Sequence, residues 1–163
     1  MSNPFHHTPP DKGQAWFIDA VPYNRALGLR YVGSGIGHVA FDLPWQAERV
    51  GDPDTGLMHG GGVTGLRPAA CGGAVRTRPP RLLRVATLDL RIDYLRPARA
   101  HQTLHCFAEC HRLTRHIAFA RASCHDGDAE DVLATAVGTF VVFGEGQHSP
   151  PRSQGSGSLE ISR

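Results

Sequence analysis

One stretch decides the fold of this chain: Leu57-Met58-His59-Gly60-Gly61-Gly62-Val63-Thr64-Gly65-Leu66-Arg67-Pro68-Ala69-Ala70-Cys71-Gly72-Gly73-Ala74. A glycine costs about 1 kcal/mol relative to alanine inside a helix and a proline about 3, so only tertiary packing could hold this stretch helical. Its small residues allow strands to approach the helix backbone closely. We therefore predict a buried central helix packed through Gly61, Gly65, Ala69, Gly72 and Gly73. It should end near Thr77, because Pro79-Pro80 cannot continue it.

The amino end of this predicted helix carries His59-Gly60-Gly61. The first N–H groups of a helix have no partner within it, and the helix dipole adds partial positive charge there. We therefore predict a site for an oxygen that carries or develops negative charge. Pro68 lacks an N–H and presses on the carbonyl of Thr64, so the helix either kinks at Pro68 or begins there. We favour the kink, because Gly60 needs a helix start beside it.

Length and composition favour one cytoplasmic domain. A chain of 163 residues can bury a real core, and its net charge of +2 is scattered, which argues against nucleic acid as a partner. No apolar stretch approaches the roughly 20 residues of a membrane span, and residues 1–10 do not resemble a signal peptide. Neither the cysteines nor the ten histidines show zinc-site spacing, so we predict no metal, no cofactor, and reduced, buried thiols at Cys71, Cys106, Cys110 and Cys124.

The remaining periodicities predict an α+β fold, a curved antiparallel sheet around one long helix. Short separators between the last strands indicate antiparallel neighbours. Three segments follow: a lead-in with a short helix over 1–21, the main domain over 22–144, and a disordered tail over 145–163. The predicted elements are a helix at 11–20 that Pro22 ends, strands at 27–32 and 37–43, a loop at 44–55, and strands at 84–94, 103–114, 117–125 and 132–143.

The strand at 84–94 alternates clearly. Its apolar residues are predicted to share one face that packs on the core, and the residues between them to face solvent or a partner. Asp89 and Asp93, with Arg91 between them, are interpreted as an ion-pair row. The apolar set is Ala86, Leu88, Leu90, Ile92 and Tyr94.

Three segments carry a family resemblance: 57–61, 71–74 and Ala86-Thr87-Leu88-Asp89-Leu90-Arg91-Ile92-Asp93-Tyr94-Leu95-Arg96-Pro97-Ala98. Over residues 24–142 the chain resembles hotdog-fold thioesterases of the phenylacetic-acid-degradation type, called PaaI-like. The resemblance implies a hotdog fold and hydrolysis of acyl-CoA thioesters to free acid and CoA. It also implies homodimers or homotetramers with each site built across a subunit interface.

The resemblance assigns roles to individual residues. Gly60 matches the residue whose backbone N–H binds the thioester carbonyl, His59 with Gly61 matches the loop beside it, and Thr87 matches a hydroxyl that orients water or the acid. The family's Asn shortly before the His has no clear equivalent, and Pro53 falls at or near its position. Candidates for substrate binding are the flanking Asp52 and Asp54, and Arg84, which could bind the CoA diphosphate together with Arg76, Arg78 and Arg81.

The chain departs from the family at Pro68. The family's catalytic Asp or Glu follows the His by nine residues, and Pro68 occupies that position. Gly60 and residue 68 are about 12 Å apart along a helix, so an acid there would serve the partner's site. Without a carboxylate, this position supplies neither a general base nor a nucleophile, and the permanently protonated Arg67 cannot replace it.

Three functions stay open from the sequence. The first is an acyl-CoA thioesterase that works through the Gly60 site, with Thr87, Asp52 or Asp54 positioning water. The second is a non-catalytic binder of acyl-CoA or another acyl ligand, which Pro68 supports. The third, a hotdog dehydratase or a structural oligomer, ranks last because His59 lacks an acidic partner. Cys71 is interpreted as a buried thiol before it is considered as a nucleophile.

Overall fold

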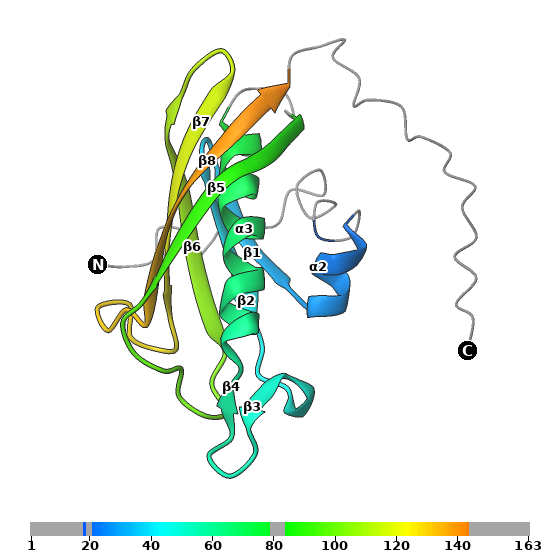
Figure 1. The fold of residues 1–163 in the computed structure, drawn as a ribbon, viewed down its shortest axis with the longest axis vertical. Coiled ribbons are helices and arrows are strands. Elements are labelled where there is room, and N and C mark those ends of the chain that lie inside the picture. The colour runs from blue at the N-terminus through cyan, green and yellow to red at the C-terminus, as the bar shows by residue number, and fades with distance from the viewer. Residues whose placement is uncertain (1–17, 19–20, 79–83, 144–163) are drawn as a thin grey trace, which may run out of the picture.

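The computed structural model describes residue 18 and residues 21–78 and 84–143. Six strands form one antiparallel sheet in the order β1-β2-β6-β7-β8-β5, and helix α3 (Gly60–Thr77) lies against one face of it (Figure 1). This is the predicted hotdog architecture. The strands are β1 (Arg30–Gly35), β2 (His38–Leu43), β5 (Arg84–Tyr94), β6 (Leu104–Leu113), β7 (Ile117–His125) and β8 (Ala134–Phe143).

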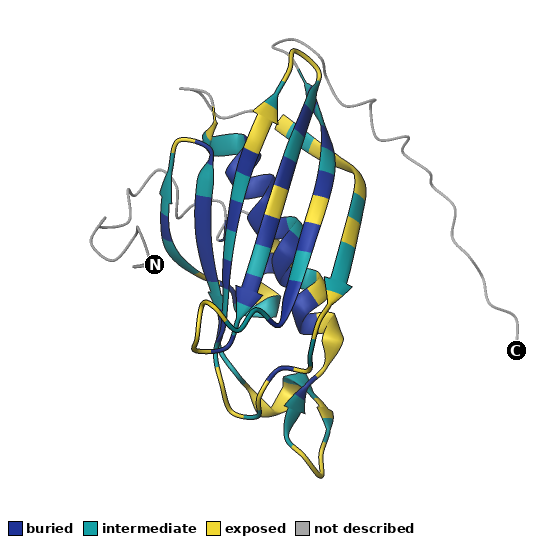
Figure 2. Cartoon of the chain, turned by 90° about the vertical axis from the view of Figure 1, so that its left-hand side faces the viewer, coloured by how far each residue is buried: buried dark blue, intermediate teal, exposed yellow. Residues whose placement is uncertain are grey.

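Helix α3 is continuous from Gly60 to Thr77 with Pro68 inside it, so the helix does not begin at Pro68. Its second half is surrounded: Ala70, Cys71, Ala74 and Val75 have no exposed surface. Side chains from the sheet alternate between this core and the outer face, which gives the striped burial along the strands in Figure 2. Burial among strands, not helix propensity, holds this sequence helical, as predicted.

Strand β5 has a bulge that the sequence prediction missed. Its pairing with β8 shifts between Thr87, opposite Phe140, and Asp89, opposite Thr139. Directly opposed residues point to the same side of a sheet, so Thr87 shares the core face with Phe140 and Ala86 lies on the outer face. The predicted single apolar face is therefore wrong: Leu90 and Ile92 pack on the core, while Leu88 is 58% exposed.

A short helix, α2 (Pro22–Leu27), lies where the sequence predicted a helix end and the start of a strand. Pro22 is the first helical residue, because proline lacks the N–H that a helix start leaves unused. Gly28 ends the helix in the left-handed conformation, at φ 70°, and its N–H donates to the Arg25 carbonyl. Strand β1 therefore begins only at Arg30.

The predicted loop before α3 also contains structure. A short 3-10 helix, η1 (Ala47–Arg49), leads into an antiparallel pair, β3 (Val50–Asp52) and β4 (Leu57–Met58). This pair projects beyond the amino end of α3 (Figure 1). It delivers His59 to the start of the helix.

Several predictions fall outside the described residues: the lead-in and the 11–20 helix apart from Ile18, which is helical and buried, the Pro79-Pro80 break, and the tail. Within the described residues, all four cysteines are free and buried, as predicted. Arg91 pairs with Asp93 of its own strand at 3.0 Å. No helix in the described part combines the length and apolar character needed to cross a membrane.

Candidate functional site

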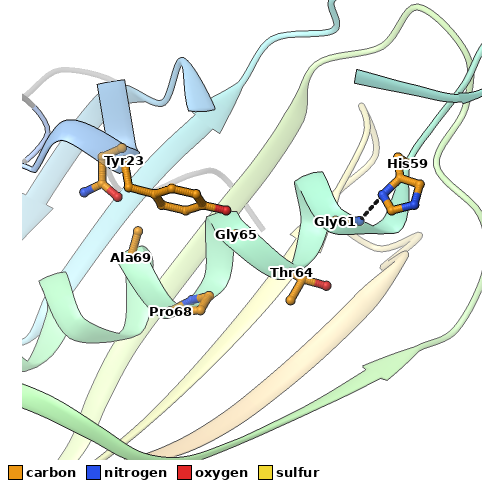
Figure 3. A pocket seen from close by; sticks show the side chains of 8 residues that line it. Tyr23, His59, Gly61, Thr64, Gly65, Pro68 and Ala69 are labelled. Atoms are coloured by element: carbon orange, nitrogen blue, oxygen red, sulfur yellow. Dashed lines mark hydrogen bonds between the residues drawn. The ribbon is translucent and has the colours of Figure 1, made fainter. Parts of the chain in front are cut away.

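His59 caps the amino end of α3. Its backbone is extended, at φ −61° and ψ 137°, and its Nδ1 accepts a hydrogen bond from the Gly61 N–H at 2.9 Å (Figure 3). An acceptor Nδ1 places the proton of the neutral imidazole on Nε2. The cap leaves no room for a side chain at residue 61, because a Cβ there would lie 2.8 Å from His59 Nδ1.

The Gly60 N–H is the amide that the cap leaves unused. Gly61 donates to His59 Nδ1 and Gly62 to the His59 carbonyl, whereas no acceptor for Gly60 N is found within the described part of the chain. His59, Gly60 and Gly61 are all exposed. A free N–H at the positive end of a helix dipole is therefore open to a ligand oxygen.

The β3–β4 pair fixes the position of His59. The His59 N–H donates to the Arg49 carbonyl at 2.7 Å, which joins the residue before α3 to η1. Gly51 makes this approach possible, because a Cβ there would lie 2.9 Å from the His59 Cα. The loop that the sequence left without structure is thus the support of the cap.

A cavity of about 580 Å³ lies between α2 and this face of α3. Gly65 keeps it open and lets α2 approach, since a Cβ there would lie 2.7 Å from Leu27 and 3.1 Å from the Tyr23 hydroxyl. Figure 3 shows the Tyr23 ring extending over Gly65, with His59 at one end and Pro68 and Ala69 at the other. The lining residues are Tyr23, Asn24, His59, Gly61, Thr64, Gly65, Pro68 and Ala69.

The structure brings only part of the predicted site together. One cavity is lined by His59, Gly61 and Pro68. Gly60 lies between His59 and Gly61 in the sequence. Thr87 lies elsewhere: Phe140, its cross-strand partner, is the side chain nearest to a Cβ placed on Gly72, in the second half of α3. Gly60 and Gly72 are about 18 Å apart along the helix, so Thr87 cannot reach the Gly60 amide of its own chain.

The three predicted substrate-binding residues are also spread out. Asp52 accepts hydrogen bonds from the Asp54 N–H and the Thr55 hydroxyl, which lower the pKa of its carboxyl group, and so stabilises the β3–β4 turn. Asp54 is exposed in that turn. Arg84 lies near Arg76 at the carboxyl end of α3, where burial and then the Arg84 charge lower the pKa of Arg76.

Sequence reasoning missed the wall that α2 contributes. Tyr23 is 62% exposed, and Asn24 is buried with 4% of its surface accessible. Both residues follow Pro22, which had been interpreted as a helix end. A proline at the first helical position and a glycine after the last one are the signal that could have revealed α2.

Arg67 is the other residue whose surroundings the sequence did not predict. Its side chain has no exposed surface, and its Nη1 donates to the Thr135 carbonyl at 2.9 Å. The guanidinium carbon lies 5.7 Å from the centre of the Tyr94 ring, in a cation–π contact. Arg67 thus faces the sheet while Pro68 faces the cavity.

The buried thiols do not form a reactive centre. Burial raises the pKa of Cys71 to about 12, so this thiol is protonated at neutral pH and is not a nucleophile. Cys106 and Cys124 are opposite each other on β6 and β7, and a hydrogen bond from Cys106, aided by the Arg67 charge, lowers the pKa of Cys124. The structure thus agrees with the interpretation of Cys71 as a core residue.

A helix wrapped by an antiparallel sheet, with a free amide at its capped end, defines a hotdog protein. Residues 55–133 match the Thioesterase superfamily. The chain is 32% identical over 142 residues to the medium/long-chain acyl-CoA thioesterase YigI of Salmonella typhimurium. The aligned region covers 77% of this chain and 88% of that protein. YigI of Escherichia coli is 31% identical over an alignment of the same length, which covers the same percentages of the two chains.

Solved structures agree. A Pseudomonas aeruginosa protein superposes with a TM-score of 0.72 at 32% identity, over 78% of this chain and 95% of that one. A single-site variant of the phenylacetic acid degradation protein PaaI from Thermus thermophilus superposes with a TM-score of 0.65 at 27% identity, over 76% and 100% of the two chains. The chain therefore belongs to the thioesterase superfamily, as a hotdog-fold protein of the PaaI-like type.

Proposed function

We propose that the protein hydrolyses acyl-CoA thioesters to free acid and CoA, with the thioester carbonyl bound by the Gly60 N–H. The observation that carries the proposal is this free amide at the capped, exposed start of α3, next to a cavity whose lining is half glycine, alanine and proline and includes the Tyr23 ring. Such a cavity suits an acyl chain. The names of the YigI relatives support medium to long acyl groups as the substrate class.

The chemistry follows from the amide. An N–H aimed at the carbonyl oxygen stabilises the negative charge that develops when water attacks the carbon. The tetrahedral intermediate then collapses, the C–S bond breaks, and the CoA thiolate leaves and takes up a proton. Pro68 supplies no carboxylate to accept the proton of the attacking water, so that proton passes to solvent and we expect a low kcat.

Self-association completes the proposal. β5 pairs with β8 along one edge, and no strand of the described residues covers the other edge. This edge carries Leu88 and Tyr94, which are 58% and 51% exposed, and Leu95, which is 62% exposed, follows the strand. A long open edge with unpaired backbone groups favours pairing with a second strand, so we infer a homodimer through β5, or a homotetramer made of two such pairs.

The dimer gives Thr87 a place. An antiparallel pairing of two β5 strands centred on Leu90 sets Thr87 of one protomer opposite residue 93 of the other. The next residue, Tyr94, contacts Gly60, so Thr87 would then lie near the amino end of its partner's α3. Sedimentation velocity should give a dimer or tetramer at micromolar concentration, and a monomer would contradict this part of the proposal.

A non-catalytic acyl-CoA binder is the second candidate. The observation that favours it is the lining of the cavity, which includes Pro68 and contains no Asp or Glu. Arg84 remains a candidate for a contact with the CoA diphosphate in either case. The two functions differ in one measurement, release of free CoA thiol.

The experiment is a thiol-release assay with acyl-CoAs of increasing chain length, on the wild type, Gly60→Pro and Gly60→Ala. Proline suits a first helical position after an extended residue, and its ring replaces the amide hydrogen. A Cβ at residue 60 would be 3.8 Å from the Tyr94 hydroxyl, an ordinary contact. Gly60→Pro should lose about 100-fold or more in kcat, and Gly60→Ala should stay near wild type. Equal activity in both variants would reject the role of the Gly60 amide, and a wild type that releases no thiol would reject the hydrolase proposal.

A further inference from the structure

Two hydroxyl groups meet at the first turn of α3. Thr64 Oγ1 lies 2.6 Å from the Tyr94 hydroxyl, although the residues are 30 positions apart. Both oxygens also lie within hydrogen-bond distance of the Gly60 carbonyl, at 3.0 Å from Thr64 and 3.1 Å from Tyr94. The last residue of β5 is thereby joined to the turn that carries the Gly60 amide.

The Thr64 hydroxyl, the Tyr94 hydroxyl and the Gly60 carbonyl form three mutual contacts. A carbonyl cannot donate, and each hydroxyl has one hydrogen, so two hydrogens serve three contacts. The 2.6 Å contact needs a hydrogen between its oxygens, so one hydroxyl donates to the other and the second donates to Gly60. When Tyr94 donates to Gly60 and Thr64 to Tyr94, both lone pairs of Thr64 stay free to accept from another group.

The free lone pairs of the Thr64 hydroxyl are available to a group inside the cavity. It lines the cavity, whereas Tyr94 is not among the lining residues. Thr64 is four residues after Gly60, about 6 Å along the helix, whereas Pro68 is about 12 Å away. Gly60 and Thr64 are both exposed in the first turn of α3, so a ligand at the start of the helix can meet the Gly60 amide and a water on Thr64 Oγ1.

Tyr94 is held in place by Arg67. The guanidinium against its ring is fully buried and also bonded to the Thr135 carbonyl, so the ring packs against a fixed group. A side chain held by packing positions its hydroxyl better than a mobile one. When Thr64 donates to Tyr94, the fixed Tyr94 hydroxyl determines where the Thr64 hydrogen points.

We propose that Thr64 binds and orients the attacking water, with Tyr94 as its positioning residue. This inference rests on the proposed thioester hydrolysis and explains how a chain without an acid at residue 68 could support it. A hydroxyl is too weak a base to deprotonate water, so the pair contributes orientation, and the proton of the water passes to solvent.

The test compares Thr64→Val, which keeps the shape and removes the hydroxyl, with Thr64→Ser, which restores it, and with Tyr94→Phe. Losing one neutral hydrogen bond corresponds to a factor of about 2 to 10, so kcat should fall by about 10-fold in Thr64→Val and about 3-fold in Tyr94→Phe. KM should not change, and Thr64→Ser should recover most of the rate. Tyr31→Phe is the matched control, because it removes a similar hydroxyl pair, Tyr31 with Ser34 at 2.7 Å, on β1.

A second nucleophile separates water positioning from a structural effect. Hydroxylamine attacks thioesters without a positioned water. The enzyme-dependent rate of hydroxamate formation should therefore survive in Thr64→Val and be lost in Gly60→Pro. A wild-type kcat in Thr64→Val, or an equal loss with water and hydroxylamine, would overturn the inference while leaving the Gly60 proposal intact. A wild type that does not hydrolyse acyl-CoA would overturn both.

Discussion

The two halves of α3 use the same small residues for different purposes. At the amino end Gly60 and Gly61 are exposed, and the Gly61 amide donates to the His59 cap. In the second half Gly73 is buried against β2, where an added Cβ would lie 3.2 Å from Val39. Glycine therefore serves packing in the second half, whereas in the first half it leaves an exposed amide at Gly60, where we propose recognition of a ligand.

The largest expected effect comes from Pro68, at the boundary between the halves. Pro68→Asp restores a carboxylate at the family position, and a positioned general base contributes about 100-fold to 10,000-fold. The kcat for acyl-CoA hydrolysis should rise by a factor in this range. Pro68→Asn is the control, because it also removes the proline from the helix and should stabilise the fold without raising kcat. An equal kcat in wild type and Pro68→Asp would show that the acid position is not used.

The second prediction tests the packing half against the recognition half. Gly73→Val should destabilise the protein by about 1–3 kcal/mol, because the added atoms strike Val39 and Phe41. Gly60→Ala should change the free energy of unfolding by less than about 0.5 kcal/mol, since residue 60 is exposed. Urea unfolding of both variants measures the difference. Equal destabilisation would contradict the division of α3 into two halves.

Features of the fold that depend on neighbouring residues could be predicted from the sequence, and contacts between residues far apart in the chain could not. The predicted helix at Gly60 and its end near Thr77 were right, because the small residues that allow close packing and the Pro79-Pro80 pair after the helix are local signals. The bulge at Leu88 was not predictable, because the apolar alternation continues through it in the sequence. The contact between Thr64 and Tyr94 depends on how β5 crosses the helix, and no local pattern encodes it. Pro22 was misinterpreted because proline favours a helix start as well as a helix end.

A third prediction concerns acid and the segment that follows β5. Hydrogen bonds from Arg96 and the Arg99 backbone lower the pKa of Asp126 from 3.8 to about 2. A lowered pKa stabilises the folded state above the ordinary value, so this contribution is complete above pH 4 and is lost as the pH falls towards 2. These hydrogen bonds to Asp126 hold residues 96–99, just beyond Tyr94, against the end of β7.

Asp126→Asn should remove this dependence and lower stability at neutral pH by about 1–2 kcal/mol, a moderate value because the Arg99 side chain is 55% exposed. Urea unfolding at pH 3 and pH 7 measures the change. The difference in stability between the two pH values should be smaller in Asp126→Asn than in wild type. An unchanged difference would assign the acid sensitivity to other carboxyl groups.

The central claim is that the Gly60 amide polarises an acyl carbonyl, and infrared difference spectroscopy tests it most directly. The measurement compares the carbonyl stretch of a 13C-labelled acyl-CoA, free and bound at saturation, after rapid mixing with the wild type, Gly60→Ala or Gly60→Pro. We predict a shift to lower wavenumber in the wild type and in Gly60→Ala, and its loss in Gly60→Pro. An unshifted carbonyl in the wild type, or the same shift in Gly60→Pro, would contradict the claim.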